Sequence, residues 1–237
     1  MSGSTYTVPF HVHIPCAPHT GTFRFGKPDG YTFVPGQYFS LTLQTREGPQ
    51  TKHFSHADAP GDPHIELTTR LTGSAFKDAL LALKPHDDVT FTGPRGRLTV
   101  PDGVGRVGFL VGGVGITPAR SIIRDAVGRS SGLDVLLFYG NLDQSCIPFK
   151  LEFDAVAADV PGIRVVHVLQ VPLPGWEGER GFITADVVRN HTDPCDGRHW
   201  FVSGPPQMVE AMKRVAAQLG LPDDVMHIES FAGYAPA

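Results

Sequence analysis

A glycine-rich segment, Gly112-Gly113-Val114-Gly115-Ile116-Thr117-Pro118, follows the apolar run Val107–Val111 and leads into a helical pattern over residues 119–127. Glycines let a backbone approach a pyrophosphate closely, and a helix N-terminus presents free N–H groups and partial positive charge to an anion. Pro118 suits the first helical turn, where its missing N–H costs little. The spacing therefore indicates a dinucleotide phosphate site. A plain strand-to-helix turn is the alternative when this segment is taken alone.

A second junction, Ser203-Gly204-Pro205-Pro206, follows the apolar run Trp200-Phe201-Val202 and opens another helical pattern. Ligands of open α/β sheets gather at the carboxyl ends of the strands. Because both junctions belong to one predicted sheet, together they favour a dinucleotide cleft more strongly than either does alone.

The elements that position these junctions change character along the chain. In the first hundred residues apolar and polar side chains alternate, as at Phe39, Leu41 and Leu43, which predicts antiparallel strands closing into a small β-barrel or sandwich. From about residue 103, continuous apolar runs alternate with helical patterns, which predicts a doubly wound parallel α/β sheet. We therefore expect an N-terminal antiparallel β-barrel domain over residues 1–102 and a C-terminal Rossmann-like α/β domain over residues 103–237.

Composition excludes several classes of protein. The 237 residues carry 20 basic and 24 acidic side chains, so the chain lacks the positive excess that nucleic-acid binding needs. No apolar run approaches the roughly 20 residues that span a bilayer, and the N-terminus has no secretory pattern, so we expect no membrane span and a cytoplasmic location. His11 and His13 share a strand face, where solvated side chains are favoured over a metal site, and the three cysteines form no metal motif.

These features together resemble the ferredoxin reductase family of FAD- and nicotinamide-dependent electron transferases. The resemblance covers nearly the whole chain, with its motifs in the family's order. They are Pro35-Gly36-Gln37-Tyr38, Lys52-His53-Phe54-Ser55, Gly73-Ser74-Ala75-Phe76, Gly93-Pro94-Arg95-Gly96, Gly112–Pro118, Phe138-Tyr139-Gly140-Asn141, Ser203-Gly204-Pro205-Pro206 and Glu229-Ser230-Phe231. The resemblance implies a barrel that carries FAD and a C-terminal domain that binds NAD(P), which agrees with the change of period.

The resemblance also implies which residues bind the flavin. Lys52-His53-Phe54-Ser55 is similar to the family's Arg-x-Tyr-Ser motif, in which the aromatic ring packs against isoalloxazine and the hydroxyl reaches its N5 edge. Lys52 offers a compact point charge where arginine grips the pyrophosphate with two donors, so looser FAD binding is expected. Ser74 is expected to cap a helix that either faces the pyrophosphate or has a capping role alone. The remaining implied FAD contacts are Thr68, Thr69, Arg70 and Gly73.

For the nicotinamide nucleotide, the resemblance implies hydride transfer to flavin N5 followed by release of single electrons. Ser55 and Glu229 are the implied catalytic residues, and Phe231 resembles the aromatic residue that can cover the flavin; a surface position on a final strand is the alternative for Glu229. The implied nucleotide contacts are Gly113, Gly115, Thr117, Pro118, Gly204 and Pro205.

The electron acceptor is expected to be a separate redox protein or a small molecule, because the chain shows no cluster or haem domain. Asp143 follows the run Val135–Tyr139, where a 2′-phosphate needs a cation, which favours NADH over NADPH. Arg120 and Lys150 are the cations whose approach would reverse that preference. A non-catalytic flavin-binding subunit of a larger complex is the alternative function, and a monomer is compatible with the sequence.

Overall fold

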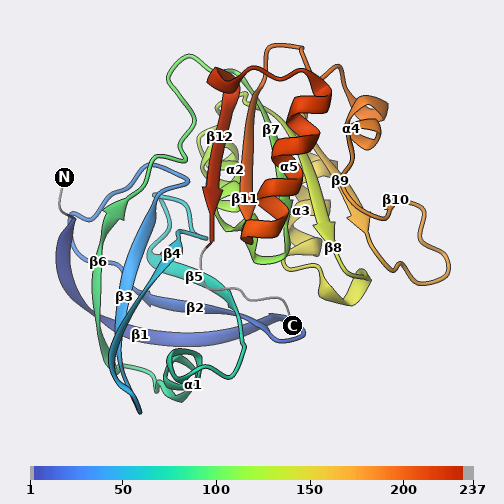
Figure 1. Cartoon of the computed structure of the whole chain (residues 1–237). Coiled ribbons are helices and arrows are strands. Elements are labelled where there is room, and N and C mark those ends of the chain that lie inside the picture. Colours follow the sequence, from blue (N-terminus) through green and yellow to red (C-terminus); the bar gives the residue numbers. More distant parts are fainter. Residues whose placement is uncertain (1–2, 232–237) are drawn as a thin grey trace.

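The computed structural model describes residues 3–231, which form two six-stranded sheets (Figure 1). The first sheet is antiparallel throughout, with the strand order β4-β3-β6-β1-β2-β5, and it curls into a half-barrel with helix α1 (Ala75–Ala82) at one end. Its strands are β1 (Ser4–Ala17), β2 (Thr20–Gly26), β3 (Tyr38–Thr45), β4 (Gly48–Ser55), β5 (His64–Arg70) and β6 (Asp88–Arg95). The antiparallel barrel expected from the sequence is therefore confirmed, in the form of a half-barrel.

The alternating pattern of β3 separates the inside of the half-barrel from its outside. Phe39 and Leu41 are fully buried and join Phe91 and other aromatic side chains in one core. Burying such a side chain stabilises the fold by about 2 kcal/mol. Ser40, which the pattern predicted to face outward, is buried as well, and its hydroxyl hydrogen-bonds to Nδ1 of His53 at 2.8 Å.

The second sheet is parallel, with the strand order β10-β9-β8-β7-β11-β12. Its strands are β7 (Arg106–Gly112), β8 (Asp134–Asn141), β9 (Ile163–Leu169), β10 (Glu179–Arg180), β11 (His199–Gly204) and β12 (Met226–Ser230). The helices around it are α2 (Ile116–Gly128), α3 (Lys150–Asp159), α4 (Ala185–His191) and α5 (Pro206–Leu219), with the 3₁₀ turns η1 (Gly113–Gly115), η2 (Gln144–Cys146) and η3 (Asp223–Val225).

Helices cover both faces of this parallel sheet, which confirms the doubly wound arrangement. Along β7, Phe109 and Val111 pack into the core shared with α2 and α3, whereas Leu110 packs into the core shared with α4 and α5. Strands buried on both sides consist of continuous apolar residues, as the sequence showed. Helix α5 is the one expected after the second junction, and it ends at Gly220, whose φ of 72° is a left-handed cap.

The carboxyl ends of the parallel strands face the half-barrel, as the arrowheads of β8 and β12 show (Figure 1). Strand order reverses at β7, which lies between β8 and β11. Open α/β sheets bind their ligands at such a switch point. Separately, no helix within residues 3–231 has the length and apolar character needed to span a membrane.

Candidate functional site

Phe54 and Ser55 are the last two residues of β4, and both are buried. The Phe54 ring packs against Phe76 with a centroid separation of 5.8 Å and is only 8% exposed, so little of the ring is open to a flavin. The Ser55 hydroxyl has no hydrogen-bond partner among the described residues. Burying an unsatisfied hydroxyl costs about 1–3 kcal/mol. Ser55 Oγ is therefore a group that a bound ligand can satisfy.

Ser74 is the N-cap of α1, as predicted, because its side chain accepts a hydrogen bond from the backbone N–H of Lys77. Gly73, directly before it, has a φ of 71°, a backbone conformation that favours glycine. Of the other residues implied for the flavin, Thr68 shares a 2.7 Å hydrogen bond with Thr22, and Arg70 is exposed. Thr69 is fully buried and accepts a hydrogen bond from the ammonium group of Lys77.

The two glycine-containing junctions pack directly on each other. A Cβ added to Gly115 would lie 2.3 Å from the carbonyl oxygen of Ser203, so only glycine fits there. The Ser203 hydroxyl also donates to the carbonyl oxygen of Gly115 at 2.7 Å. Gly113, with a φ of 52°, faces open space. Both junctions therefore belong to one cleft edge.

The other nucleotide residues occupy the starts of the two adjoining helices. Thr117 and Pro118 lie in the first turn of α2, and both are buried. The Thr117 hydroxyl donates to the carbonyl oxygen of Val114 at 3.2 Å, so it is used within its own turn. Pro205 is the N-cap residue of α5.

Glu229 lies beside the second junction. Strand β12 pairs with β11 so that Glu229 is opposite Ser203, and the backbone N–H of Phe231 donates to the carbonyl oxygen of Gly204 at 2.9 Å. Within residues 3–231, one carboxylate oxygen of Glu229, Oε2, is buried without a partner, and burial raises the pKa of the side chain to about 7. Glu229 is therefore a partly buried residue of the final strand.

Asn141 is a candidate that sequence reasoning identified only as part of a motif. It ends β8 at the same sheet edge, it is 5% exposed, and neither its Oδ1 nor its Nδ2 has a hydrogen-bond partner among residues 3–231. A buried amide with no partner is costly, so this side chain is suited to a polar ligand at the cleft. The available signal was a polar amide at the end of an apolar strand.

Helix α2 joins the glycine turn to the half-barrel. Arg120 donates from Nη1 to the carbonyl oxygen of Ala57 and to Oε2 of Glu66, both at 2.6 Å. The Ser121 hydroxyl donates to the carbonyl oxygen of Asp58 at 2.6 Å. Because Ala57 and Asp58 follow Ser55 closely in the chain, these contacts bring the start of α2 to the end of β4. The flavin motif and the glycine turn therefore lie at one junction between the sheets.

Glu66 is a buried carboxylate at this junction, and two arginines bind it. It accepts hydrogen bonds from Arg120 and from Nε of Arg24, the latter at 2.6 Å, and its side chain is 2% exposed. Burial alone raises the pKa of a carboxyl group, but the two guanidinium groups outweigh that effect and hold the pKa of Glu66 at about 2. The carboxylate therefore stays ionised, and its charge is neutralised within the interface.

Arg120 and Lys150 are the two cations whose approach to the nucleotide would favour NADPH over NADH, and both take part in ion pairs. Besides Glu66, Arg120 binds Glu152, and its guanidinium lies 4.1 Å from the ring centroid of Phe149. Lys150 pairs with Asp154 one turn along α3. Both side chains are therefore engaged in ion pairs in this structure.

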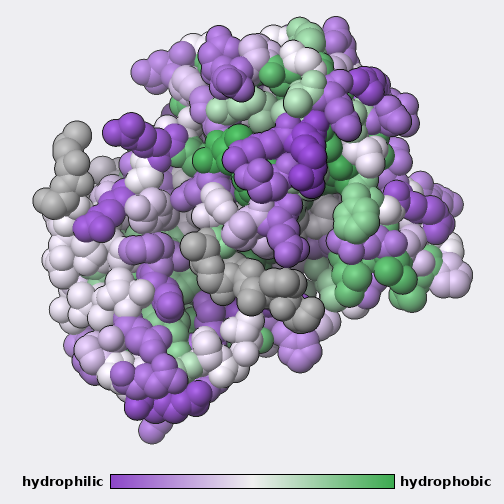
Figure 2. Space-filling view, in the orientation of Figure 1, coloured by the Kyte–Doolittle hydropathy of each residue, from purple (hydrophilic) through white to green (hydrophobic). Residues whose placement is uncertain are grey.

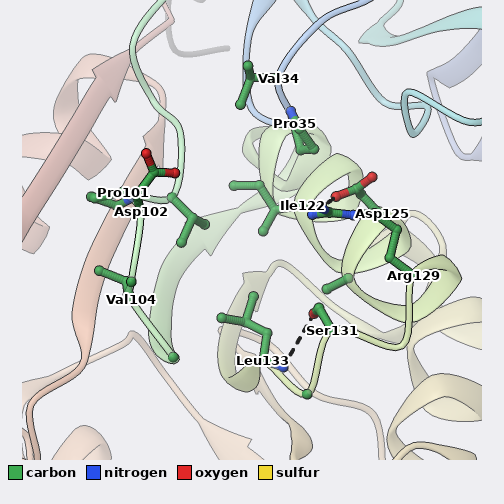
Figure 3. Close-up of a pocket in the computed structure, with 15 residues that line it drawn as sticks. Val34, Pro35, Pro101, Asp102, Val104, Ile122, Asp125, Arg129, Ser131 and Leu133 are labelled. Carbon is green, nitrogen blue, oxygen red and sulfur yellow. Dashed lines mark hydrogen bonds and ion pairs between the residues drawn. The ribbon is translucent and has the colours of Figure 1, made fainter.

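Two surface features bear on where a ligand binds. Figure 3 shows a cavity of 260 Å³ between the loop at Val34, the linker near Val104 and helix α2, and none of its lining residues carries a buried polar atom without a partner. Figure 2 shows apolar surface gathering beside β10 and the end of β8. In that region Leu142 and Val171 are exposed and joined by a backbone hydrogen bond of 2.8 Å. Ser55, Asn141 and Glu229, which have buried polar atoms without a partner among residues 3–231, are not among the residues that line this cavity.

Comparison with known proteins gives consistent matches. Residues 109–214 match the family described as the oxidoreductase NAD-binding domain. The chain is 29% identical over 230 residues to ferredoxin–NADP reductase B of Sorangium cellulosum strain So ce56, covering 92% of this chain and 93% of that protein. It is 34% identical over 212 residues to NADH-cytochrome b5 reductase 1 of Aspergillus terreus strain NIH 2624, covering 84% of this chain and 71% of that protein.

A similarity of structure extends over nearly the whole chain. The crystal structure of Amycolatopsis cytochrome P450 reductase GcoB superposes with a TM-score of 0.84 at 26% identity, covering 97% of this chain and 71% of that one. The match includes both sheets, since it leaves only a small part of this chain uncovered.

Proposed function

Because this chain belongs to the ferredoxin reductase-like family of FAD- and NAD(P)-binding oxidoreductases, we propose that it oxidises NADH with a bound FAD and passes the electrons to a separate redox protein. The observation that carries this proposal is the buried hydroxyl of Ser55 at the junction with helix α2, which has no partner within residues 3–231. Asn141 and Glu229 add unsatisfied polar atoms at the facing sheet edge. These donors and acceptors fit two ligands that meet between the sheets.

FAD, when bound, supplies a ring that accepts a hydride and releases electrons one at a time. The residues of this chain would hold and orient it: the small exposed part of the Phe54 ring would border the flavin, and Ser55 would donate a hydrogen bond to the ring edge. Across the cleft, the turn Gly113–Gly115 and the N-terminus of α2 would hold the nucleotide diphosphate. The Glu229 carboxyl group, with a pKa of about 7, would bind the carboxamide end of the nucleotide or hold a proton there.

The proposed acceptor is a protein that takes single electrons. The similar proteins include a ferredoxin reductase, a cytochrome b5 reductase and a cytochrome P450 reductase, so their acceptors differ in cofactor but share one-electron chemistry. This common property supports a small iron–sulfur or haem protein as the acceptor of this chain.

The main test is an anaerobic titration of the purified protein with NADH and with NADPH. We expect the bound flavin to lose its visible absorbance with one equivalent of NADH, because a hydride moves two electrons to the ring. A yellow flavin that neither nucleotide bleaches would instead support the non-catalytic subunit. Colourless protein that releases no FAD on denaturation would contradict the proposal altogether.

Preference for NADH should depend on Asp143. Asp143 is partly exposed and caps η2, and hydrogen bonds from the Ser145 hydroxyl and backbone lower the pKa of its carboxyl group, so it is ionised at neutral pH. An ionised carboxylate repels a 2′-phosphate and accepts a hydrogen bond from a 2′-hydroxyl. We expect Asp143→Asn to lower the ratio of kcat/KM for NADH to that for NADPH by about tenfold at low salt.

The control for this prediction is Asp159→Asn, which removes an exposed carboxylate at the C-terminal end of α3. Its ratio should stay within twofold of the parent value. Equal effects of the two substitutions would mean that the overall charge of the protein, and not contact at Asp143, sets the preference.

A further inference from the structure

Lys77 lies in the first turn of α1, three residues after the N-cap Ser74, and its side chain is directed into the half-barrel. Only 9% of the residue is exposed. A lysine at this position of an amphipathic helix would ordinarily point to solvent, because burying an ammonium ion without an anion is costly. The buried ammonium group therefore needs an anion or hydrogen-bond acceptors beside it.

The described residues satisfy only part of the hydrogen-bonding capacity of the Lys77 ammonium group. It donates to Oγ1 of Thr69 and lies 4.6 Å from the ring centroid of Phe54 and 5.6 Å from that of Phe76. An ammonium group has three donors, and Thr69 accepts one of them. The aromatic faces attract a cation but accept no conventional hydrogen bond.

The charged group that acts on Lys77 is itself a cation. Burial and the nearby charge of Lys52 lower the pKa of Lys77 to about 7. Lys52 belongs to β4. It precedes Phe54 by two residues, so the two side chains lie on the same face of that strand. The closest carboxylate in α1, that of Asp78, is used by Arg46 at 2.7 Å. Two lysines that repel each other beside the Ser74 cap form a site for an anion with several oxygens.

We propose that Lys77 is a second cation of the flavin site, whose ammonium group donates, together with Lys52, to the diphosphate of FAD. This proposal rests on the function proposed above, because FAD is the ligand that brings such an anion to the end of β4. In this proposal Lys77 compensates for the lysine at position 52. The two ammonium groups and the N-terminus of α1 take the place of a single arginine that would bind the diphosphate through two hydrogen bonds. It also explains why Thr69, on the adjoining strand, orients the amine.

The test compares binding of two flavins to the apoprotein and its variants, measured by quenching of flavin fluorescence. FAD carries the diphosphate, whereas riboflavin has the same ring and ribityl chain without phosphates. At pH 6.5 we expect Lys77→Met to raise the Kd for FAD about 10- to 100-fold and to change the Kd for riboflavin less than twofold. Lys84→Met, which removes an exposed lysine just beyond the same helix, should change neither constant.

The pH dependence of the unmodified protein provides a second measurement, which needs no variant. Above pH 7 the free Lys77 amine is neutral and must take up a proton to bind a phosphate. The Kd for FAD should therefore rise with pH above 7 by up to about tenfold per unit, and this slope should vanish in Lys77→Met. Riboflavin binding should show no such slope in either protein.

The outcomes separate the two proposals. Equal losses for FAD and riboflavin in Lys77→Met, or a Kd for FAD that does not change between pH 6 and 9, would overturn the role of Lys77. Unmodified protein that binds neither flavin would instead overturn the proposed function.

Discussion

Replacing Ser55 with alanine should slow reduction of the flavin by NADH on the order of 100-fold, while the Kd for NADH changes less than twofold. The hydroxyl is buried at the end of β4 and has no partner in the described part of the chain, so it is available to donate to the ring atom on which charge develops. Removing one such donor from a water-excluded site costs about 2.7–4 kcal/mol of transition-state stabilisation. Stopped-flow single-turnover reduction under anaerobic conditions measures the rate directly.

A matched control for Ser55→Ala is Thr51→Ala, which removes a hydroxyl from an exposed position of the same strand. Its reduction rate should equal that of the parent. Because the Ser55 hydroxyl has no partner within the described residues, the apoprotein of Ser55→Ala should be at least as stable as the parent. Unchanged reduction in Ser55→Ala would remove Ser55 from the catalytic residues.

Replacing Arg120 with methionine should lower the free energy of unfolding by about 3–5 kcal/mol at pH 7. The guanidinium is 5% exposed and joins Glu66 of the half-barrel to Glu152 of helix α3, so its loss leaves a buried carboxylate incompletely paired across the junction. Urea unfolding of the apoprotein, followed by circular dichroism, measures the change. Arg129→Met, which removes an exposed guanidinium one turn from the partly buried Asp125, should cost less than about 0.5 kcal/mol.

The ion pair between Arg120 and Glu66 should also make the free energy of unfolding depend on pH under acidic conditions. The pKa of Glu66 is about 2 in the folded protein and 4.5 in its ordinary state. The resulting stabilisation of about 3 kcal/mol is fully present above pH 4.5 and is lost as the pH falls toward 2. In Arg120→Met this loss should be much smaller. A parent protein whose stability does not change between pH 4.5 and 2 would show that Glu66 is not held ionised.

Local signals were sufficient to predict much of this fold. The alternating residues of β3 and the continuous apolar residues of β7 each reflect which sides of a strand are buried, and the cap at Ser74 depends on residues within one helical turn. The two glycine-containing junctions could be recognised because strand, turn and helix follow one another in the sequence.

The remaining parts of the site depend on contacts between distant residues. Arg120 and Glu66 are 54 residues apart, and a sequence pattern gives no reason to pair them; Arg120 was instead considered as a possible nucleotide contact. Lys77 has the sequence context of an ordinary surface lysine, and its burial follows from the way α1 packs against the half-barrel. Ser55 and Asn141 are distinguished by buried polar atoms that have no well-aligned hydrogen-bond partner among residues 3–231, which only the folded structure reveals.

The contact between Gly115 and Ser203 restricts how the protein can diversify. Because a Cβ has no space at Gly115, a substitution there must displace the backbone of Ser203 and so disturb the packing of the two junctions. The segment around Leu142 and Asp143 is exposed and bears no comparable constraint. Evolution, or an engineer, can therefore alter the choice of nicotinamide donor at the rim while the part that grips the diphosphate stays fixed. Related proteins should accordingly vary in coenzyme preference far more readily than in the glycine turn.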